Sequence, residues 1–259
     1  MRKKLSAVVF ALLMFGAGCA APAVTPDPTA KKTASPATSW NNIAAGIDRY
    51  ECPAQICGVG LIMFRFAKDR FVWRFENRAQ PSTVEAWAAS LPKAVFVANG
   101  VYFDEKFQPT GLLKTAGTLT NGRTYDADKS GLLELAPQVA IIDTATAKPA
   151  LETMTEAGQN FPLLIKNGAG VATFKDEHAS RRTFVGVDRE ENVYVGTVAE
   201  DAIDFSDLAA LLAKTDVKWD NVINLDGGTS TGFSVRAGGY EETLNSIVQV
   251  PNVIIAERK

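Results

Sequence analysis

The sequence predicts an α+β domain dominated by strands, with two main helices packed on one mixed sheet or partly closed barrel. Short runs rich in Val, Ile, Phe and Trp recur along the chain, and most of them are separated only by turn residues. Two segments carry helical signals, residues 84–91 and the stretch that Ser206 opens. The composition, 46% hydrophobic and 22% charged over 259 residues, fits one large domain with a sizeable core and excludes a disordered or fibrous chain.

The first residues have the pattern of an export signal. Three basic residues precede the apolar run 5–15, and small residues follow it up to Cys19. This pattern predicts a signal peptide over residues 1–18, because the run is too short to span a bilayer as a permanent helix. Small residues before a cysteine resemble the lipobox of bacterial lipoproteins, although Gly16 stands where leucine is usual. We therefore expect lipidation at Cys19, with plain secretion as the alternative. Ala20 after the cysteine is typical of sorting to the outer membrane, facing the periplasm.

Residues 19–39 are expected to form a tether. They hold four prolines among alanine, threonine and serine, and their apolar content is too low for a fold. The folded domain is expected over residues 40–259. The formal net charge is −2, with no long run of either sign, so the sequence has no electrostatic footprint for nucleic acid or an anionic membrane. A lipid anchor is the only membrane contact expected.

The two remaining cysteines, Cys52 and Cys57, form a C-x4-C pair in a chain predicted to enter an oxidising compartment. A small disulfide loop is the favoured interpretation. A metal pair is the weaker alternative, because His178 is the single histidine and the sequence holds no further cysteine as a soft ligand.

The first half of the domain is predicted to hold a hairpin, a short helix and four further strands. A capping box at residues 82–85 opens the helix, which runs over 84–91 and ends before Pro92. Asn121-Gly122 is a type I′ turn signal. Runs of β-branched and aromatic residues predict the strands: 58–66 and 70–74 as the hairpin, then 94–98, 131–135, 138–142 and 162–166.

The second half is predicted to hold a hairpin, a helix and two closing strands. Strands over 181–187 and 192–198 are expected to pair with each other. The helix that follows has three leucines on one face. Strands over 233–236 and 247–255 close the chain, and Pro251 is expected at an edge or a bulge.

The stretch from Val222 to Phe233 carries the strongest local indication of a site. An apolar β-branched run ends in Asp226, two glycines and three hydroxyl residues, which indicates a buried strand that delivers an acid and a glycine-lined loop to one edge of the core. Glycines let backbone N–H groups approach a ligand, and the hydroxyls add donors suited to phosphate or sugar oxygens. The alternative is a hairpin turn in which Asp226 caps its own backbone.

Five segments of the chain occur in an order that a known family shares. They are Asn99-Gly100-Val101-Tyr102-Phe103, Pro109-Thr110-Gly111, Pro162-Leu163-Leu164-Ile165-Lys166-Asn167-Gly168, Arg182-Thr183-Phe184-Val185-Gly186-Val187-Asp188 and Ile223-Asn224-Leu225-Asp226-Gly227-Gly228-Thr229-Ser230. With them the chain resembles the phosphodiester glycosidase family over about residues 90–256. Val101 replaces a usual small residue and Thr229 a common glycine, which leaves the substrate less defined than the reaction.

The resemblance implies hydrolysis of a sugar-1-phosphodiester on envelope or exopolysaccharide glycans, with release of sugar and a phosphate monoester. Since that leaving group is weakly basic, one carboxylate and one cation suffice where ordinary glycosides need two carboxylates. Asp226 is then the base or nucleophile at the anomeric carbon, and Arg182 the partner of the phosphate oxygens. No cofactor is expected, and the need for a divalent cation is left open. Substrate-binding roles are expected for Asn99, Gly100, Tyr102, Asn167, Gly227, Gly228 and Ser230.

Other interpretations of these residues are open. Arg182 also fits a solvated charge on a strand, and Tyr102 and Phe103 fit core positions. His178 fits a surface loop better than a proton shuttle. Residues 225–230 also resemble the phosphate loop of actin-like sugar kinases, but an exported protein meets little ATP. The main alternative function is a non-catalytic lipoprotein that binds glycan or peptidoglycan with the same groove.

Overall fold

The computed structural model describes residues 39–120, 125–174 and 178–259. The signal peptide, Cys19, nearly all of the tether and the Asn121-Gly122 turn lie outside these described residues. The chain divides into two units, Met1–Ser35 and Pro36–Lys259, and the second carries every element below. In the described ranges, no helix is long and apolar enough to cross a membrane.

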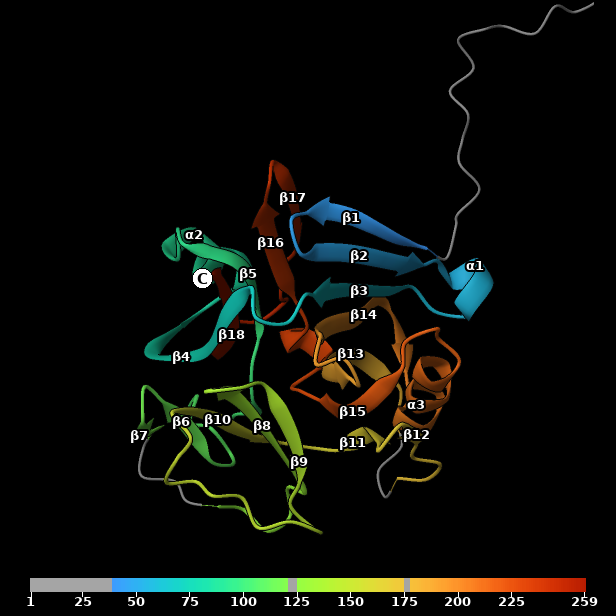
Figure 1. Ribbon diagram of the computed structural model, residues 1–259. Coiled ribbons are helices and arrows are strands. Elements are labelled where there is room, and N and C mark those ends of the chain that lie inside the picture. The colour runs from blue at the N-terminus through green and yellow to red at the C-terminus, as the bar shows by residue number, and fades with distance from the viewer. Residues whose placement is uncertain (1–38, 121–124, 175–177) are drawn as a thin grey trace, which may run out of the picture. The chain divides into compact units, whose positions relative to one another are not determined.

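The largest sheet of the folded unit has eight strands and is called the large sheet here (Figure 1). Each pairing within it is antiparallel. In spatial order its strands are β1 (Trp40–Ala44), β2 (Ile47–Cys52), β3 (Leu61–Phe66), β14 (Val193–Ile203), β13 (Ser180–Asp188), β15 (Trp219–Asn224), β11 (Leu163–Lys166) and β12 (Ala169–Gly170).

Two five-stranded sheets complete the described strands, and both are antiparallel. The second sheet has the order β17 (Tyr240–Leu244), β16 (Phe233–Ala237), β5 (Ala94–Asn99), β18 (Val250–Arg258) and β4 (Phe71–Ser82). The third sheet has the order β7 (Thr118–Leu119), β6 (Leu113–Thr115), β10 (Glu156–Asn160), β8 (Gly131–Ala136) and β9 (Ala140–Asp143). The β18–β4 register shifts between Val250 and Asn252, so Pro251 occupies a bulge, as expected.

Three α-helices lie in the described part of the chain: α1 (Ala54–Cys57), α2 (Val84–Ser90) and α3 (Phe205–Ala213). Both helices expected from the sequence are present. The Thr83 hydroxyl accepts a hydrogen bond from the Ala86 N–H at 3.3 Å and caps α2. Asp204, rather than Ser206, caps α3, because its carboxylate accepts from the Asp207 N–H at 2.8 Å.

The expected fold class needs correction. Strands make up 50% of the structure and helices 11%, so the strand-dominated prediction is confirmed while the α+β label fits only loosely. The sheets are not closed into a barrel, and every pairing between described strands is antiparallel rather than mixed. The chain builds three packed sheets, a division that local strand patterns do not encode.

The predicted hairpin over residues 58–74 is also wrong. Strand β3 pairs with β2 and β14 in the large sheet, whereas β4 pairs with β18 in the second sheet. The short turn between them therefore crosses from one sheet to the other. The predicted hairpin of 181–187 with 192–198 is confirmed as β13 and β14.

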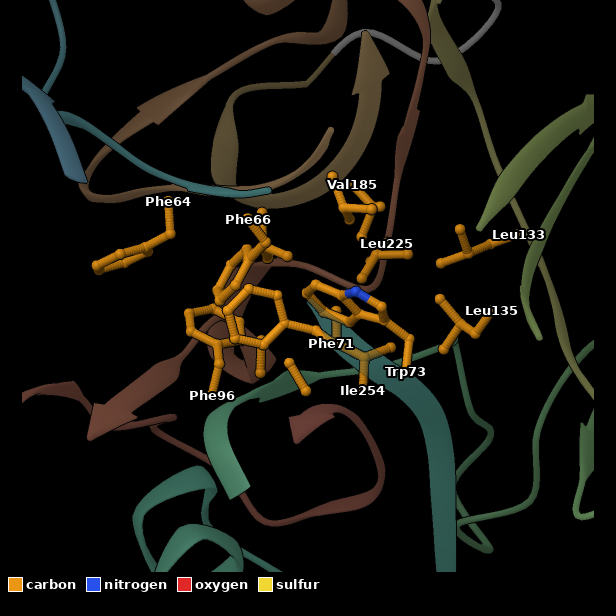
Figure 2. Packing of buried hydrophobic residues seen from close by; sticks show 14 of the residues in the cluster. Phe64, Phe66, Phe71, Trp73, Phe96, Leu133, Leu135, Val185, Leu225 and Ile254 are labelled. Carbon is orange, nitrogen blue, oxygen red and sulfur yellow. The ribbon is translucent and has the colours of Figure 1, made fainter. Parts of the chain in front are cut away.

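The main core holds apolar side chains from all three sheets. Figure 2 shows Phe66 of β3 beside Phe71 and Trp73 of β4 and Phe96 of β5. The Phe66 ring lies 4.9 Å from that of Trp73 and 5.2 Å from that of Phe96, both edge-on. Such aromatic pairs add stability beyond the area that they bury. This core therefore fixes the second sheet against the large one.

Strand β13 separates the main core from a second cluster under α3. Val185 and Val187 belong to the main core, while Phe184 packs in the cluster with Leu208 and Leu212 of α3. This division follows from the alternation of side chains along a strand. The same alternation directs neighbouring polar residues at the start of β13 to opposite faces.

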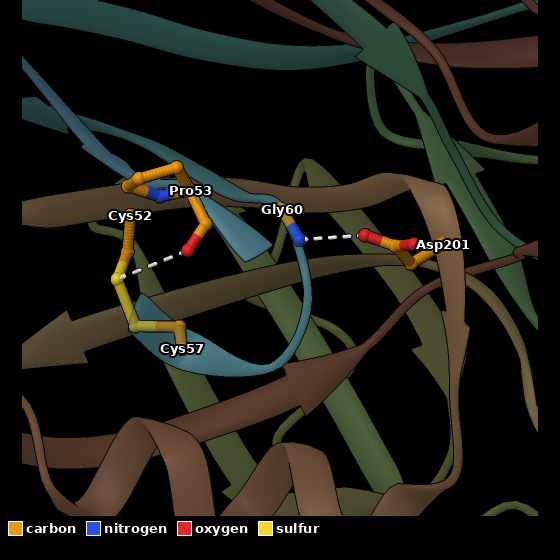
Figure 3. Close-up of a disulfide and its surroundings, with 5 residues drawn as sticks. All are labelled: Cys52, Pro53, Cys57, Gly60 and Asp201. Atoms are coloured by element: carbon orange, nitrogen blue, oxygen red, sulfur yellow. Dashed lines mark hydrogen bonds between the residues drawn. A yellow bond between two sulfur atoms is a disulfide. The ribbon is translucent and has the colours of Figure 1, made fainter. Parts of the chain in front are cut away.

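Cys52 and Cys57 form a disulfide, as predicted (Figure 3). The four-residue helix α1 fills the loop that the bond closes. The segment after it is fixed to β14 by a 2.8 Å hydrogen bond from the Gly60 N–H to the Asp201 carboxylate. Both ends of this small loop are thus held on the large sheet.

Replacing both cysteines with serine should lower the free energy of unfolding by about 2–3 kcal/mol without abolishing the fold, because a short bridge removes only moderate entropy from the unfolded chain. Denaturant unfolding of the two proteins without reductant measures the difference. Equal stability, or two free thiols in the mass of the unreduced exported protein, would contradict a persistent bridge.

Candidate active site

The end of β15 presents Asp226 in a tight glycine loop. A Cβ atom on Gly227 would lie 2.7 Å from the Arg181 carbonyl oxygen, so this position has no room for a side chain. Gly228 has a φ of +58°, which favours glycine, and begins the short 3₁₀ helix η2 (Gly228–Ser230). The Ser230 N–H donates to the Gly227 carbonyl at 3.0 Å and closes the turn. The sequence therefore folds this loop back beside Asp226.

Asn99, at the end of β5, joins the second sheet to this loop. Its side-chain amide donates to the Asp226 carbonyl at 2.7 Å, and its side-chain oxygen accepts from the Thr183 hydroxyl at 2.8 Å and from the Gly232 N–H at 3.2 Å. Asn99 is fully buried. These bonds occupy its amide with protein groups, so the side chain orients the backbone of Asp226.

Gly100 contributes a backbone contact to the same junction. Its carbonyl accepts a 3.2 Å hydrogen bond from the Asp226 N–H. The Asn252 side-chain oxygen packs where a Cβ of Gly100 would be, and it accepts from the Val101 N–H at 2.6 Å. Asn252 was not among the predicted site residues. A buried asparagine within the apolar strand of residues 250–256 is the signal that indicates it.

Tyr102 lies beside the end of β15. Its hydroxyl donates to the Phe161 carbonyl at 3.1 Å and accepts from the Asn224 amide at 2.6 Å. Its ring stacks on Phe161, with 4.8 Å between centroids. Burial is the main cause that raises the pKa of Tyr102, and the negative charge of Asp226 raises it further, which keeps the phenol protonated. Phe161 and Asn224 are two more members of the cluster that were not predicted as site residues.

The Asp226 carboxyl group has an unusual pKa for an aspartate. Burial raises this pKa to about 6, while hydrogen bonds from the Ser230 hydroxyl and the Gly227 N–H oppose the rise. The Gly227 bond is 2.9 Å long. No described lysine or arginine forms a salt bridge with Asp226. A carboxyl group held in this way exchanges protons near neutral pH, which suits a base or a nucleophile.

Arg182 is a buried cation, 4% exposed, rather than a solvated surface charge. Its Nε donates to the Ile203 carbonyl at 3.0 Å, its Nη2 donates to the His178 carbonyl, and its guanidinium lies 3.8 Å from the ring centre of Phe205. Burial lowers the pKa of Arg182, and the nearby Tyr102 and Asp204 oppose this. Among the described residues, Nη1 accounts for no hydrogen bond, in contrast to Nε and Nη2.

The strand register brings Arg182 and Asp226 to one face. Phe184 pairs with Asn224, and the Leu225 N–H donates to the Thr183 carbonyl at 2.8 Å, so the pairing continues past the end of β15. One further step puts Arg182 opposite Asp226, and residues directly opposite in antiparallel strands share a face. Tyr102, bonded to Asn224, lies on this face as well.

Arg181 lies on the other face of β13, with Thr183. Its Nη2 donates to the Thr231 carbonyl at 3.2 Å, and its buried Nε has no partner in the described structure. Burial lowers the pKa of Arg181. The two neighbouring arginines therefore bond to different parts of the protein: Arg181 to the Asp226 loop and Arg182 to the end of β14 and to residue 178. Substituting each in turn separates their effects.

Asn167 is the one predicted site residue that the structure does not bring to this cluster. It lies in the turn between β11 and β12, and its N–H donates to the Asn221 side chain at 3.0 Å. Asp226 lies beyond the opposite end of β15. At ~3.3 Å per residue, the six residues of this strand separate the two sites by roughly 17–20 Å. The described residues include no group of three or more His, Cys, Asp or Glu side chains that could hold a metal ion.

The family model of the phosphodiester glycosidases matches residues 92–257, which includes every segment of this cluster. The chain belongs to the phosphodiester glycosidase family. The matched range begins after the disulfide loop and strands β1 to β4, so those elements lie outside the part that defines the glycosidase. No match is found among curated proteins.

Solved structures with the same fold include two that cover most of this glycosidase. A hypothetical protein from Synechocystis superposes with a TM-score of 0.65 at 15% identity, over 87% of this chain and 64% of that protein. The catalytic domain of zebrafish N-acetylglucosamine-1-phosphodiester α-N-acetylglucosaminidase, auto-inhibited by its pro-peptide, superposes with a TM-score of 0.61 at 16% identity, over 88% of this chain and 85% of that domain. At these identities the comparison supports the fold of the phosphodiester glycosidase.

Proposed function

We propose that this phosphodiester glycosidase hydrolyses a sugar-1-phosphodiester at the bond between the anomeric carbon and the phosphate oxygen. Water adds to the anomeric carbon, and the phosphate departs as a monoester. The observation that carries this proposal is the Asp226 carboxyl group, whose pKa of about 6 accompanies a glycine loop and no salt bridge to a described cation. Such a group is ionised at neutral pH and close enough in pKa to accept a proton.

The other residues have separable tasks in this proposal. The Nη1 of Arg182, which donates to no described residue, stabilises the negative charge that develops on the departing phosphate. The Gly228 N–H is offered to substrate oxygens, the Ser230 hydroxyl holds the Asp226 carboxyl group, and Tyr102 holds the sugar beside Asp226. Asn99 and Asn252 are positioning residues, because Asn99 bonds to the Asp226 carbonyl and Asn252 holds the Gly100 and Val101 backbone to which the Asp226 N–H bonds.

Isotope labelling tests the reaction directly. The full-length protein, extracted in detergent, is incubated in ¹⁸O-water with a panel of sugar-1-phosphodiesters that starts with the methyl ester of α-N-acetylglucosamine 1-phosphate. This sugar is chosen from the name of the zebrafish enzyme. We expect equal amounts of free sugar and methyl phosphate, with the label in the sugar. Label in the phosphate would contradict attack at carbon, and binding without turnover across the panel would favour the non-catalytic glycan-binding alternative.

The substrate is proposed to be an envelope or exopolysaccharide glycan, because the export pattern of the first residues predicts a location outside the cytoplasm. A lipid on Cys19 would hold it at the outer membrane, facing the periplasm. Cys19→Ala should move the protein from the membrane fraction to the soluble fraction. Cys52→Ser is the matched control, since it removes a cysteine from the folded domain and should not change the partition. Unchanged detergent partition of Cys19→Ala would reject the lipid anchor.

A further inference from the structure

The loop between β17 and β18 carries two exposed aliphatic side chains. Ile247 is 68% exposed, more than any other large apolar side chain in the described ranges, and Val248 is 37% exposed. We call these two residues the Ile247–Val248 tip. Single exposed apolar residues are common on protein surfaces, so exposure alone assigns no role. The position and the rigidity of the tip are what distinguish it.

The tip is bonded to the loop that carries Asp226. The N–H groups of Ile247 and Val248 both donate to the Thr229 carbonyl, at 2.8 and 3.2 Å. Thr229 is the middle residue of η2, and Ser230 of the same turn bonds to the Asp226 carboxyl group. Thr229 follows Asp226 by three residues, and the Ser230 N–H to Gly227 carbonyl bond keeps this turn beside the acid. The tip therefore lies at the rim of the proposed site.

The other side of the same loop is fixed to helix α2. The Ser246 hydroxyl accepts from the Val84 N–H at 3.2 Å and donates to the Val248 carbonyl at 2.7 Å. The Asn245 side chain accepts from the Glu85 N–H at 3.0 Å. A Cβ atom on Gly232 would lie 2.8 Å from the Ser246 nitrogen, so the two loops pack closely. Hydrogen bonds to α2 and to Thr229 thus fix the backbone on both sides of Ile247, whose side chain is exposed.

The loop on the other side of Asp226 also carries an apolar side chain. Phe107, 36% exposed, follows Tyr102 in the chain, and its ring stacks on Phe103 with 5.8 Å between centroids. Phe103 packs against the α2 cluster, which includes Val250. The loop after Tyr102 therefore carries an exposed apolar side chain, Phe107, as the β17–β18 loop carries Ile247 and Val248.

Charge near the tip argues for a neutral apolar occupant. The segment 237–257 contains no lysine or arginine, and the acid Glu85 is bonded to Asn245 at 3.1 Å, while Arg181 is bonded to the Thr231 carbonyl on the Asp226 side of the tip. An anionic membrane surface would call for basic residues here. A hydrocarbon group that is part of the bound ligand needs none.

We propose that the Ile247–Val248 tip binds an alkyl aglycone, so that the substrate of this site is a sugar-1-phosphodiester of a lipid-like alcohol. This inference rests on the proposed function. The sugar lies against Tyr102 and Asp226, the phosphate follows between Arg182 and η2, and the alkyl group that stays attached to the departing phosphate extends over Thr229 toward the tip. Contact with Ile247 and Val248 removes the hydrocarbon from water, which favours a longer chain.

Two esters of α-N-acetylglucosamine 1-phosphate, methyl and hexyl, test the proposal on the full-length protein in detergent below its micelle concentration. Calorimetry gives Kd and steady-state kinetics give KM. We expect the hexyl ester to bind about 10-fold more tightly, as burial of a few methylenes allows. Ile247→Ser should reduce this preference to about 2-fold or less, with the methyl ester and the melting temperature unchanged.

Val72→Ser is the matched control, because Val72 is 48% exposed on β4, where it pairs with Glu257 of β18. It should keep the 10-fold preference. An undiminished preference in Ile247→Ser overturns the proposal, as does Ile247-dependent binding to neutral vesicles or Ile247-dependent dimerisation with equal affinity for both esters. If neither ester is hydrolysed, the proposed reaction fails, while the two Kd values still decide the role of the tip.

Discussion

Asp226→Asn should bind an intact sugar-1-phosphodiester with near-normal affinity and hydrolyse it at least about 10³-fold more slowly than the unmutated enzyme. Asparagine keeps the shape of the side chain and can accept the Gly227 N–H, but it can neither take a proton nor attack carbon. Losses of 10² to 10⁴ are typical when a general base is removed, and a nucleophile costs more. Single-turnover kinetics and calorimetry on the same protein separate the two effects.

The same substitution should raise stability at neutral pH. Because the pKa of Asp226 is raised from 3.8 to about 6, the folded protein holds a proton that the unfolded chain releases above about pH 4. Folded-state stability therefore falls as pH rises from about 4 to 6, by up to ~3 kcal/mol. Asparagine does not titrate, so the variant should gain about 1–3 kcal/mol at pH 7. In the unmutated enzyme, turnover should fall as the pH drops below about 6, where the carboxylate becomes protonated.

Asp188→Asn is a matched control for this test. Asp188 is also buried, but it lies at the far end of β13, where it accepts from the Tyr194 hydroxyl at 2.8 Å and from the Asn192 amide at 2.9 Å. Its substitution should lower stability and leave the turnover of the folded enzyme unchanged. Near-normal hydrolysis by Asp226→Asn would show that Asp226 is only a turn residue, since asparagine serves equally well in turns.

Arg182→Ala should lower turnover about 100-fold or more, because the guanidinium stabilises charge that accumulates on the departing phosphate. The substitution also removes two hydrogen bonds to carbonyls and the contact with Phe205, so a loss of stability accompanies it. Rates must therefore be measured well below the melting temperature of the variant. Lysine should restore only part of the rate, since an ammonium lacks the planar fork that holds these carbonyls.

Arg181→Ala separates the catalytic effect from the general loss of a nearby cation. Arg181 has the same charge and adjoins Arg182 in the chain, but its side chain lies on the opposite face of β13. Its removal takes away one hydrogen bond to the Thr231 carbonyl and a screened charge, and it should change turnover less than about 5-fold. Equal losses for the two variants would contradict a specific contact between Arg182 and the phosphate.

The sequence predicts two of the three described α-helices and most of the strands, but not the short helix α1. Helix α2 is predictable because its cap, its apolar face and Pro92 lie within ten residues of one another. The pairing of β13 with β14 is predictable for the same reason, since a short turn leaves few alternatives. Asn99 and Asp226 follow apolar strands that end in polar residues, and the structure brings these two strand ends together.

Long-range features were not predictable from local patterns. The short turn between β3 and β4 has the composition of a hairpin, yet the aromatic residues on both strands pack into the core between two sheets. Asn224, Phe161 and Asn252 belong to the site through contacts with residues 59 to 151 positions away. Asn167 follows an apolar strand as Asn99 does. Strand β11, however, ends beside the start of β15, whereas Asp226 lies beyond the end of β15.

The junction made by Asn99 has a consequence for how this enzyme can diversify. Asp226 follows a strand of the large sheet, whereas Gly100 and Tyr102 follow a strand of the second sheet, and one buried amide fixes the two strand ends together. The loop after Tyr102 and the loop at residues 245–248 both follow strands of the second sheet, whereas the strand that delivers Asp226 belongs to the large sheet. Changes in either of these two loops can therefore reshape the surroundings of the carboxyl group while the strand before Asp226 keeps its place.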